Sequence, residues 1–205
     1  AGTVEEVVYD TRAYATDERS VKKTAYVYLP YGYSEEKEYN ILYLMHGTGD
    51  DEKYWLKTNP YNKTMLDNMI ANGDIEPLIV VTPTFYVEDD CADDLDQLTY
   101  SFAKELRNDL MPEIESSYST YAKSADDEGF SQSRDHRAFA GLSRGAVTMY
   151  HSALCQSLDY FSWFGAFSGS RTDKIAFEDT IQTGDFAELP IHYLYVASGS
   201  FDFAL

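Results

Sequence analysis

Apolar residues along this chain fall into short runs that stop abruptly at glycine, proline or polar residues. Such unbroken apolar runs are typical of strands in a sheet that is covered on both faces. An alternating segment at 24–33, ended by Pro30 and Gly32, predicts one further strand that leads into a turn. The strands expected from apolar runs lie from 39 to the His46-Gly47 turn and at 77–86, 136–142, 160–168 and 191–198.

Segments with helical spacing separate these strands. Residues 62–73 place apolar side chains on one helical face and end at Gly73, which predicts a helix. Residues 98–118 carry an apolar side chain at every fourth position, which predicts a long amphipathic helix that Pro112 bends or splits. A third helix is expected at 144–157. Strands that alternate with helices predict an α/β fold, a mainly parallel sheet flanked by helices.

The polar segment 119–135 is the longest expected excursion, but it is too short to be a domain boundary by itself. With 205 residues and no internal repeat, the chain is predicted to form one domain over 1–205. A hydrophobic content of 44% excludes a disordered chain. Ala1 is not a natural start, which leaves room for a removed leader or for neighbouring modules.

The charge of the chain limits its partners. The net charge is -19, from 35 acidic against 16 basic residues. Such a field repels phosphate backbones and anionic lipid surfaces, so we expect no nucleic-acid partner and no membrane partner. No apolar stretch approaches the roughly 20 residues of a membrane span. The 18 tyrosines suit a carbohydrate or phenolic surface as well as the rim of a core.

The two cysteines, Cys91 and Cys155, permit one disulfide. Cys91 is expected in a loop beyond the carboxyl end of a strand, whereas Cys155 is expected about 18 Å down the helix that follows position 143. These places are at opposite ends of the sheet, so we do not expect a bridge. No pair of histidines or cysteines has the spacing of metal ligands, and no glycine-rich phosphate loop is present. We therefore expect no metal and no other cofactor.

The segment "FAGLSRGAVTMYHSAL" at 139–154 carries the strongest chemical signal. It places Ser143 within G-x-S-x-G, between an expected strand and an expected helix. A tight strand–turn–helix connection strains the serine backbone and exposes its hydroxyl, and the glycines two residues away on each side avoid clashes. Ser143 is therefore predicted to be a nucleophile. The alternative is a solvated surface serine.

A nucleophilic serine also needs two N–H donors for the oxyanion of a tetrahedral intermediate. The first is expected from the backbone amide of Arg144, the residue after the nucleophile. The second is expected from the loop in "LYLMHGTG", where we choose Thr48. His46 precedes this loop and is expected to brace it.

The quoted segments together resemble a known family. "YVYLPYGYSEEKEYNILYLMHGTGDDEKYW", "AFAGLSRGAVTMY" and "YFSWFGAFSG" are similar to the esterase-D-like branch of the α/β-hydrolases, from about residue 24 to the end. Within this branch they most resemble feruloyl esterases and acetyl xylan esterases of carbohydrate esterase family one. The resemblance implies an α/β-hydrolase fold, secretion and ester substrates on plant cell-wall polysaccharides. Mycolyltransferases and S-formylglutathione hydrolases share the branch, so the fold alone does not fix the substrate.

In α/β-hydrolases the catalytic residues follow the order serine, acid, histidine. Asp202, just past the strand "YLYVAS", is our candidate acid, because related esterases carry their acid in a similar Gly-x-x-Asp turn. A turn-capping role is the alternative. No histidine follows Asp202. The four histidines of the chain are His46, His136, His151 and His192.

None of these histidines is expected to act as the base. His136 and His192 are expected at the far end of the sheet, and His151 lies about 12 Å along the helix after Ser143. His46 belongs to the oxyanion loop. We therefore expect the chain to be a piece of a longer esterase that supplies its histidine beyond Leu205, and to be poorly active by itself.

The predicted function is carboxylic-ester hydrolysis through an acyl-enzyme on Ser143, with feruloyl esters favoured. Trp55, Phe85 and Tyr86 are the candidates for a flat apolar slot that binds the acyl group, although each is equally suited to bracing its loop. An acetyl xylan esterase is the first alternative. The second is a non-catalytic carbohydrate-binding module on a hydrolase scaffold. Feruloylated or acetylated polysaccharide is the expected partner, with possible fusion to other carbohydrate-active modules.

Overall fold

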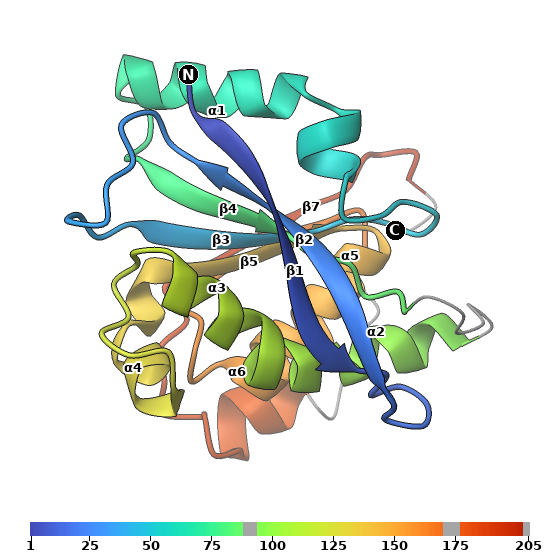
Figure 1. Cartoon of the computed structure of the whole chain (residues 1–205). Coiled ribbons are helices and arrows are strands. Elements are labelled where there is room, and N and C mark those ends of the chain that lie inside the picture. The colour runs from blue at the N-terminus through green and yellow to red at the C-terminus, as the bar shows by residue number, and fades with distance from the viewer. Residues whose placement is uncertain (88–93, 170–176, 203–205) are drawn as a thin grey trace.

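A seven-stranded sheet in the order β1-β2-β4-β3-β5-β6-β7 runs through the molecule (Figure 1). The computed structural model describes residues 1–87, 94–169 and 177–202. β1 pairs antiparallel with β2 and β2 antiparallel with β4, and every later pair is parallel. The strands are β1 (Thr3–Arg12), β2 (Ser20–Leu29), β3 (Asn40–Met45), β4 (Leu78–Thr82), β5 (Arg137–Leu142), β6 (Trp163–Phe167) and β7 (Tyr193–Ala197).

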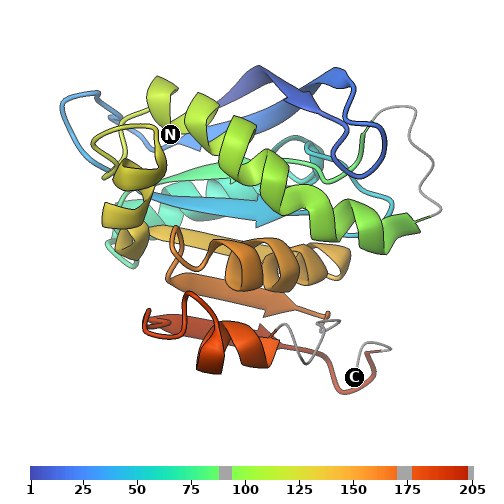
Figure 2. The same cartoon turned by 90° about the horizontal axis from the view of Figure 1, so that it is seen from below.

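Helices lie on both faces of the sheet. α1 (Tyr61–Asn72) packs on one face, behind the sheet in Figure 2, and α2, α3, α5 and α6 pack on the other. The described helical segments other than α1 are η1 (Tyr54–Thr58), α2 (Leu95–Glu105), η3 (Leu106–Leu110), α3 (Met111–Ser117), α4 (Asp127–Gln132), η4 (Arg134–His136), α5 (Arg144–Thr148), η5 (Met149–Leu154), α6 (Cys155–Ser157) and η6 (Asp179–Thr183). This arrangement of layers confirms the predicted α/β-hydrolase fold. Within the described residues, no helix has the length and apolar character needed to cross a bilayer.

The long helix predicted at 98–118 is one helical stretch over 95–117 that changes its hydrogen bonding part-way. A π-helical segment, η3, precedes Pro112, and the amide of Met111 bonds the carbonyl of Leu106, five residues back. Pro112 then stands in the first turn of α3, where its missing N–H is tolerated. The proline therefore neither splits the helix nor stops it.

Strand β1 was not predicted. Its sequence TVEEVVYDTR is mostly exposed, because β1 is the edge strand and only Tyr9 and Thr11 are buried. A mostly exposed edge strand does not need the apolar run or the clean alternation that reveals a buried one. Its ten residues nevertheless pair in unbroken register with β2. The segment predicted as a polar excursion, 119–135, contains the short helix α4.

A buried ion pair fixes the amino end of the interior strand β5. The guanidinium of Arg137 bonds both carboxylate oxygens of Glu115 on α3, at 2.8 and 2.7 Å. Its other N–H groups reach the carbonyls of Phe130 and Tyr160 and the hydroxyl of Ser133. All five donors of the guanidinium are thus paired, although the side chain is only 1% exposed. The network joins β5 to α3, to α4 and to the turn before β6.

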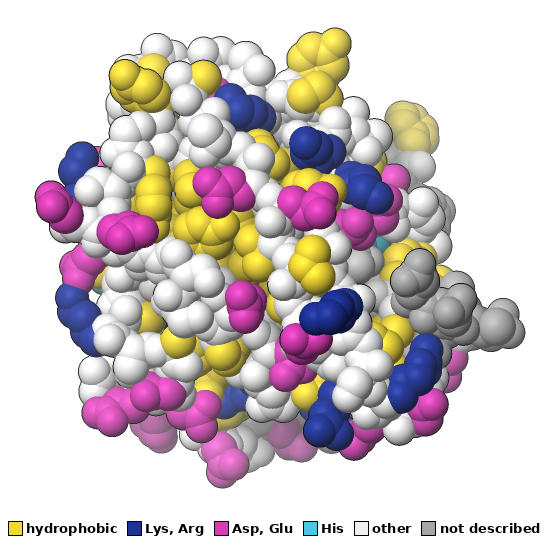
Figure 3. Space-filling view, in the orientation of Figure 1, with side chains coloured by type: hydrophobic (Ala, Val, Ile, Leu, Met, Phe, Trp, Pro, Cys, Tyr) yellow, Lys and Arg dark blue, Asp and Glu magenta, His cyan; other side chains and the backbone are white. Residues whose placement is uncertain are grey.

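One part of the sheet carries none of the described helices on its α1 side. Trp163 and Phe167 of β6 and Tyr193 and Tyr195 of β7 share one face, and all four are exposed. Their rings lie against each other, with the stacked pair Tyr193–Tyr195 at 6.4 Å between centroids. We call these four residues the aromatic edge. Figure 3 shows acidic side chains gathered along the lower edge of another face of the molecule.

We expect replacement of Arg137 by Met to destabilise the fold by about 3–5 kcal/mol, because the change leaves Glu115 charged and buried without its partner. Urea unfolding of the purified chain, followed by tryptophan fluorescence and circular dichroism, measures the loss. The matched control is Lys22→Met, which breaks the exposed Lys22–Asp10 pair at 2.6 Å and should change the stability little. Equal, small losses in both variants would contradict the anchoring role of Arg137.

Candidate active site

Ser143 stands in a strained turn between β5 and α5. Its backbone angles are φ 54° and ψ −115°, a region that non-glycine residues seldom occupy. The amide of Ser143 donates to the carbonyl of Phe167 at 2.7 Å, so the turn is tied to the end of the neighbouring strand β6. The serine is half-buried at the carboxyl end of β5 and at the amino end of the helix. This is the geometry of a nucleophile elbow.

The glycines around Ser143 are required by close backbone contacts. A Cβ on Gly141 would lie 2.2 Å from the carbonyl carbon of Gly145, and a Cβ on Gly145 would lie 2.5 Å from the carbonyl oxygen of His46. A Cβ on Gly169, just after β6, would lie 2.4 Å from the carbonyl oxygen of Ser143. Backbone atoms cannot move aside as a flexible side chain can. These glycines are therefore required by the close approach of the elbow to the ends of β3 and β6.

The loop after β3 lies next to the serine. A Cβ on Gly47 would be 3.4 Å from the Cβ of Ser143, and the next residue, Thr48, is exposed. Among the residues that the structure describes, neither the amide of Thr48 nor that of Arg144 donates to a protein acceptor. Two unused amides beside a strained serine are what an oxyanion hole requires. Their assignment as the two donors stays a prediction.

The side chain of Arg144 is held away from this role by an ion pair with Asp96 in the first turn of α2. Only the backbone amide of Arg144 is thus offered to the site. The sequence analysis did not identify Asp96. An acidic residue in the first turn of a helix is common for reasons of the helix dipole, so the pattern carried no signal of this contact.

His46 is completely buried beneath the loop, as expected of a brace. Its Nδ1 lies 2.7 Å from the carbonyl oxygen of Gly47, and its Nε2 lies 2.7 Å from the hydroxyl of Thr84. Burial lowers the pKa of His46 below the ordinary value of a histidine. Both ring nitrogens are occupied, so His46 is not free to take a proton from Ser143. Thr84, the partner that sequence reasoning missed, follows a strand as an ordinary polar residue with no distinguishing pattern.

The other histidines are engaged elsewhere. His136 precedes β5, contacts Asn40 at 2.8 Å and stacks on Tyr121. His151 lies in η5 and stacks on Tyr100, with 3.7 Å between ring centroids. His192 precedes β7, next to Trp163. The strand starts that hold His136 and His192 are at the opposite end of the sheet from Ser143, as predicted.

Asp202 follows β7 at the same end of the sheet as Ser143. Leu142, Phe167 and Ala197 are aligned across β5, β6 and β7, so the chain leaves β7 level with the elbow (Figure 2). The amide of Asp202 donates to the carbonyl of Gly199 at 2.9 Å, which closes the turn. With strands about 4.8 Å apart, a backbone two strands from Ser143 leaves room for an imidazole between acid and serine. The acid role of Asp202 stays a prediction.

The three candidates for the acyl slot lie in different surroundings. Phe85 is 2% exposed and packs between His46 and Tyr86, so its ring supports the loop and offers no open face. Trp55 packs against Tyr54 and against the small core cluster under α1. This packing corresponds to the loop-bracing role that was the alternative to the acyl slot. Tyr86 is half-buried and stacks on His46, and its hydroxyl accepts from the amide of Gly49 at 3.1 Å. Tyr86 is thus the candidate that both braces the loop and reaches the surface near it.

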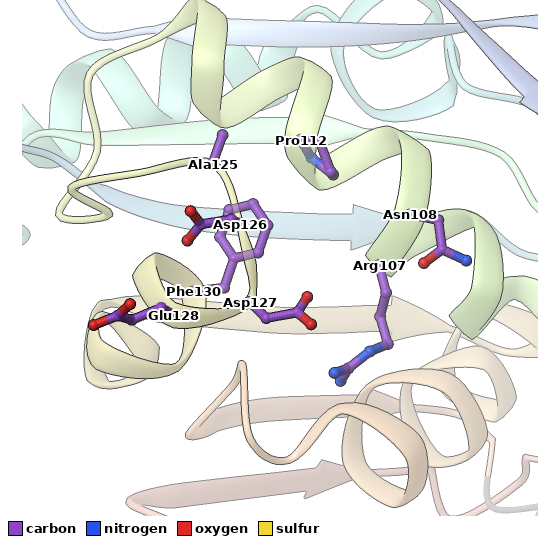
Figure 4. A pocket seen from close by; sticks show the side chains of 8 residues that line it. All are labelled: Arg107, Asn108, Pro112, Ala125, Asp126, Asp127, Glu128 and Phe130. Carbon is purple, nitrogen blue, oxygen red and sulfur yellow. The ribbon is translucent and has the colours of Figure 1, made fainter.

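A hollow of about 460 Å³ lies away from this site, between α3 and α4 (Figure 4). The charged part of its wall is made by Arg107, Asp126, Asp127 and Glu128. Arg107 is engaged with Asp159 in a two-pronged ion pair at 2.6 and 2.8 Å. The hollow is near the amino ends of the parallel strands, opposite Ser143, so it is not the pocket of this serine. Cys91 lies outside the described residues. The expectation that it forms no disulfide with Cys155 therefore stays a prediction.

Comparison with known families agrees with the elbow geometry. The model of the family named Esterase matches residues 19–177. The chain belongs to the esterase family. Its sequence is 43% identical over 147 residues to endo-1,4-beta-xylanase Y of Acetivibrio thermocellus, across 72% of this chain. It is 33% identical over 153 residues to an endo-1,4-beta-xylanase/feruloyl esterase of Xylanibacter ruminicola, again across 72% of this chain. The chain spans only 13% and 19% of the lengths of these two curated relatives.

Solved structures show the same relationship. A serine-to-alanine mutant of the feruloyl esterase module from Clostridium thermocellum, complexed with sinapinate, is 34% identical to this esterase chain with a TM-score of 0.82. The similarity covers 98% of this chain and 68% of that one. A ferulic acid esterase of Anaeromyces mucronatus in complex with ferulic acid has a TM-score of 0.63 at 24% identity, over 82% of this chain and 58% of its own, and supports the fold.

We expect Gly145→Ala to destabilise the esterase chain by about 1–3 kcal/mol, because the new methyl group meets the carbonyl of His46 and forces α5 away from β3. Gly199→Ala is the control, since a Cβ at Gly199 meets none of the described residues within 4 Å. Urea unfolding of both variants is the measurement. A Gly145 variant as stable as the Gly199 variant would show that the elbow is looser than these contacts require.

The lowered pKa of His46 predicts a pH-dependent stability. An unfolded histidine titrates near about pH 6.5, whereas buried His46 resists protonation. The unfolded state therefore binds more protons below that pH, and the stability provided by neutral His46 is lost as the pH falls toward the folded-state pKa.

Unfolding free energies measured between about pH 7 and 5 should accordingly fall more steeply for the wild type than for His46→Gln. The variant His192→Gln, at an exposed position, controls for the loss of a histidine in general. Parallel curves for the wild type and His46→Gln would contradict the prediction.

Proposed function

We propose that this chain carries the nucleophile, the oxyanion donors and the acid of a feruloyl esterase that acts on plant cell-wall polysaccharides. The observation that carries the proposal is the strained Ser143 beside two unused amides, at the level of the turn that holds Asp202. The xylanase and feruloyl esterase names of its relatives support xylan as the polymer to which the ester is attached. The same relatives support fusion to xylan-degrading modules. Secretion is part of the proposal, because a cell-wall polymer lies outside the cell.

The reaction proceeds in two halves. The Ser143 Oγ attacks the ester carbonyl carbon while a base removes the hydroxyl proton, and the amides of Thr48 and Arg144 stabilise the oxyanion. Collapse of the tetrahedral intermediate breaks the bond to the sugar oxygen, which takes the proton from the base and leaves the acyl group on Ser143. Water then attacks the acyl-enzyme by the same route, which releases the carboxylic acid and restores the serine.

We further propose that the base is a histidine carried by polypeptide that follows Leu205. All four histidines of the chain are engaged away from Ser143 or beneath its loop. The chain corresponds to 68% of the solved feruloyl esterase module, so a third of that module has no counterpart here. The aromatic edge on β6 and β7 also supports the proposal, because its exposed rings offer an apolar surface against which further polypeptide would pack.

The acyl group is proposed to be a hydroxycinnamate, in keeping with the sinapinate and ferulic acid named for the two solved relatives. An acetyl ester is the competing substrate, and the burial of Phe85 favours it because this ring is not available to an aromatic acyl group. The half-exposed Tyr86 is then the aromatic residue left to contact a hydroxycinnamate.

In a chain extended beyond Leu205 to the length of the solved modules, Ser143→Ala should abolish hydrolysis of methyl ferulate without unfolding the protein. The reason is that no other group can form the acyl-enzyme. The unextended 1–205 chain should be slower by at least about 10²-fold, since it lacks the base. Initial rates with methyl ferulate, and acetate release from acetylated xylan, provide the measurements.

The exposed Ser116 supplies the control variant, Ser116→Ala, which should leave the rate unchanged. A Ser143→Ala enzyme within tenfold of wild type would overturn the nucleophile. Equal rates for the two chain lengths would place the base within residues 1–205. A clear preference for acetate would replace feruloyl by acetyl esterase activity.

A further inference from the structure

We propose that His46, Thr84 and Tyr86 set the direction of the Thr48 N–H, and that this group of three positioning residues builds the oxyanion donor on the β3 side of Ser143. The inference rests on the proposed function, because it assigns a role in the same site. It goes beyond that function in naming the side chains that hold the backbone N–H of Thr48 in place.

The peptide between Gly47 and Thr48 transmits the position of His46 to the site. None of the described peptide bonds is cis, and in a planar trans peptide the C=O and the N–H point in opposite directions. The carbonyl of Gly47 is directed at Nδ1 of the buried His46, at 2.7 Å. The N–H of Thr48 therefore points away from the core. The loop that carries it approaches the serine, since a Cβ on Gly47 would lie 3.4 Å from the Cβ of Ser143.

Hydrogen-bond accounting fixes the tautomer of His46. A carbonyl oxygen can only accept, so Nδ1 carries the proton. Nε2 then accepts from the hydroxyl of Thr84, whose oxygen also accepts from the amide of Tyr86 at 3.1 Å. Each N–H or O–H group in this series of hydrogen bonds thus has one acceptor. Loss of the Thr84 hydroxyl leaves Nε2 buried without a donor and frees the ring to adopt the other tautomer, which cannot hold the Gly47 carbonyl.

Tyr86 holds the other side of Thr48. Its hydroxyl accepts from the amide of Gly49, a residue with φ 85°, and its ring stacks on that of His46 with 18° between planes. The carbonyl before Thr48 and the amide after it are thus both attached to one aromatic pair. Rotation of the Thr48 peptide would break one of these two attachments.

The group is attached in turn to the rigid part of the fold. The backbone carbonyl of Thr84 accepts from Nζ of Lys23 at 2.6 Å, and Lys23 pairs with Glu105 of α2 at 2.8 Å, both nearly completely buried. Tyr9 of β1 donates to the same carboxylate. An oxyanion donor gains from such rigidity, because a donor that is already in place need not reorganise during the reaction.

The first experiment uses the 1–205 chain and does not depend on activity. Long-range ¹H–¹⁵N correlation spectra of ¹⁵N-labelled protein at neutral pH should show His46 with its proton on Nδ1. Thr84→Val, which removes the hydroxyl at similar volume, should shift the Thr48 amide resonance and change the His46 tautomer signals. Thr84→Ser keeps the hydroxyl and should restore both. Thr11→Val removes a hydroxyl that bonds Asp109 from the edge strand β1 and has no bond to the three residues, and is the matched control.

The second experiment measures turnover of methyl ferulate by the extended chain. Thr84→Val should lower kcat by roughly tenfold to a hundredfold, somewhat less than the loss of a whole oxyanion donor, and leave KM within about twofold. Thr84→Ser should recover most of kcat, Tyr86→Phe should lower it by a smaller factor, and Thr11→Val should leave it unchanged.

His46 with its proton on Nε2, a Thr48 amide indifferent to Thr84→Val, or a kcat equally low in Thr84→Ser and Thr84→Val would each overturn the inference. An extended chain without esterase activity would overturn the proposed function instead. The spectra of the 1–205 chain would still decide whether the three residues orient the Thr48 amide.

Discussion

The close approach of three backbones at Ser143 is the constraint on which the rest of this structure depends. β5 turns into α5 within one residue, and α5 begins against the last carbonyls of β3 with no space for a side chain at Gly145. The end of β6 is bound to the same turn through the amide of Ser143. Because these strands are neighbours in a parallel sheet, their carboxyl ends meet there, and the loops that follow them are brought around the serine.

The two ends of β5 are stabilised by different means. At its amino end the ion pair of Arg137 and Glu115 is buried with every guanidinium donor paired, so the strand cannot slide relative to α3 and α4 without exposing a buried charge. At its carboxyl end the strain of Ser143 is retained by steric contact at the glycines and by the hydrogen bond from its amide to Phe167. A fixed amino end makes a strained carboxyl end possible, because the energy stored in the turn cannot be released by a shift of the whole strand.

The sequence predicted the parts of this fold that depend on apolar runs and on glycine. Burial and close approach leave a local pattern in the sequence. This pattern made it possible to predict β3 to β7, α1, the α5–α6 helix and the elbow at Ser143. β1 was not predicted, because the β-branched and aromatic residues of this exposed edge strand form neither an apolar run nor a clean alternation. The partners Thr84, Asp96 and Lys23 were not predictable either, since contacts between residues 38 to 82 positions apart leave no local pattern.

The placement of Phe85 shows why neighbouring residues in one motif take different roles. Phe85 and Tyr86 follow the same strand and were equal candidates for contact with an acyl group. The phenyl ring has no polar atom and is fully buried against His46, whereas the tyrosine hydroxyl needs a partner and finds it in the amide of Gly49 at the surface. A tyrosine at 86 can therefore hold the loop after β3 and still reach the surface. Phenylalanine at 85 can only support the loop from below, so of these two neighbouring rings only that of Tyr86 reaches the surface beside the loop.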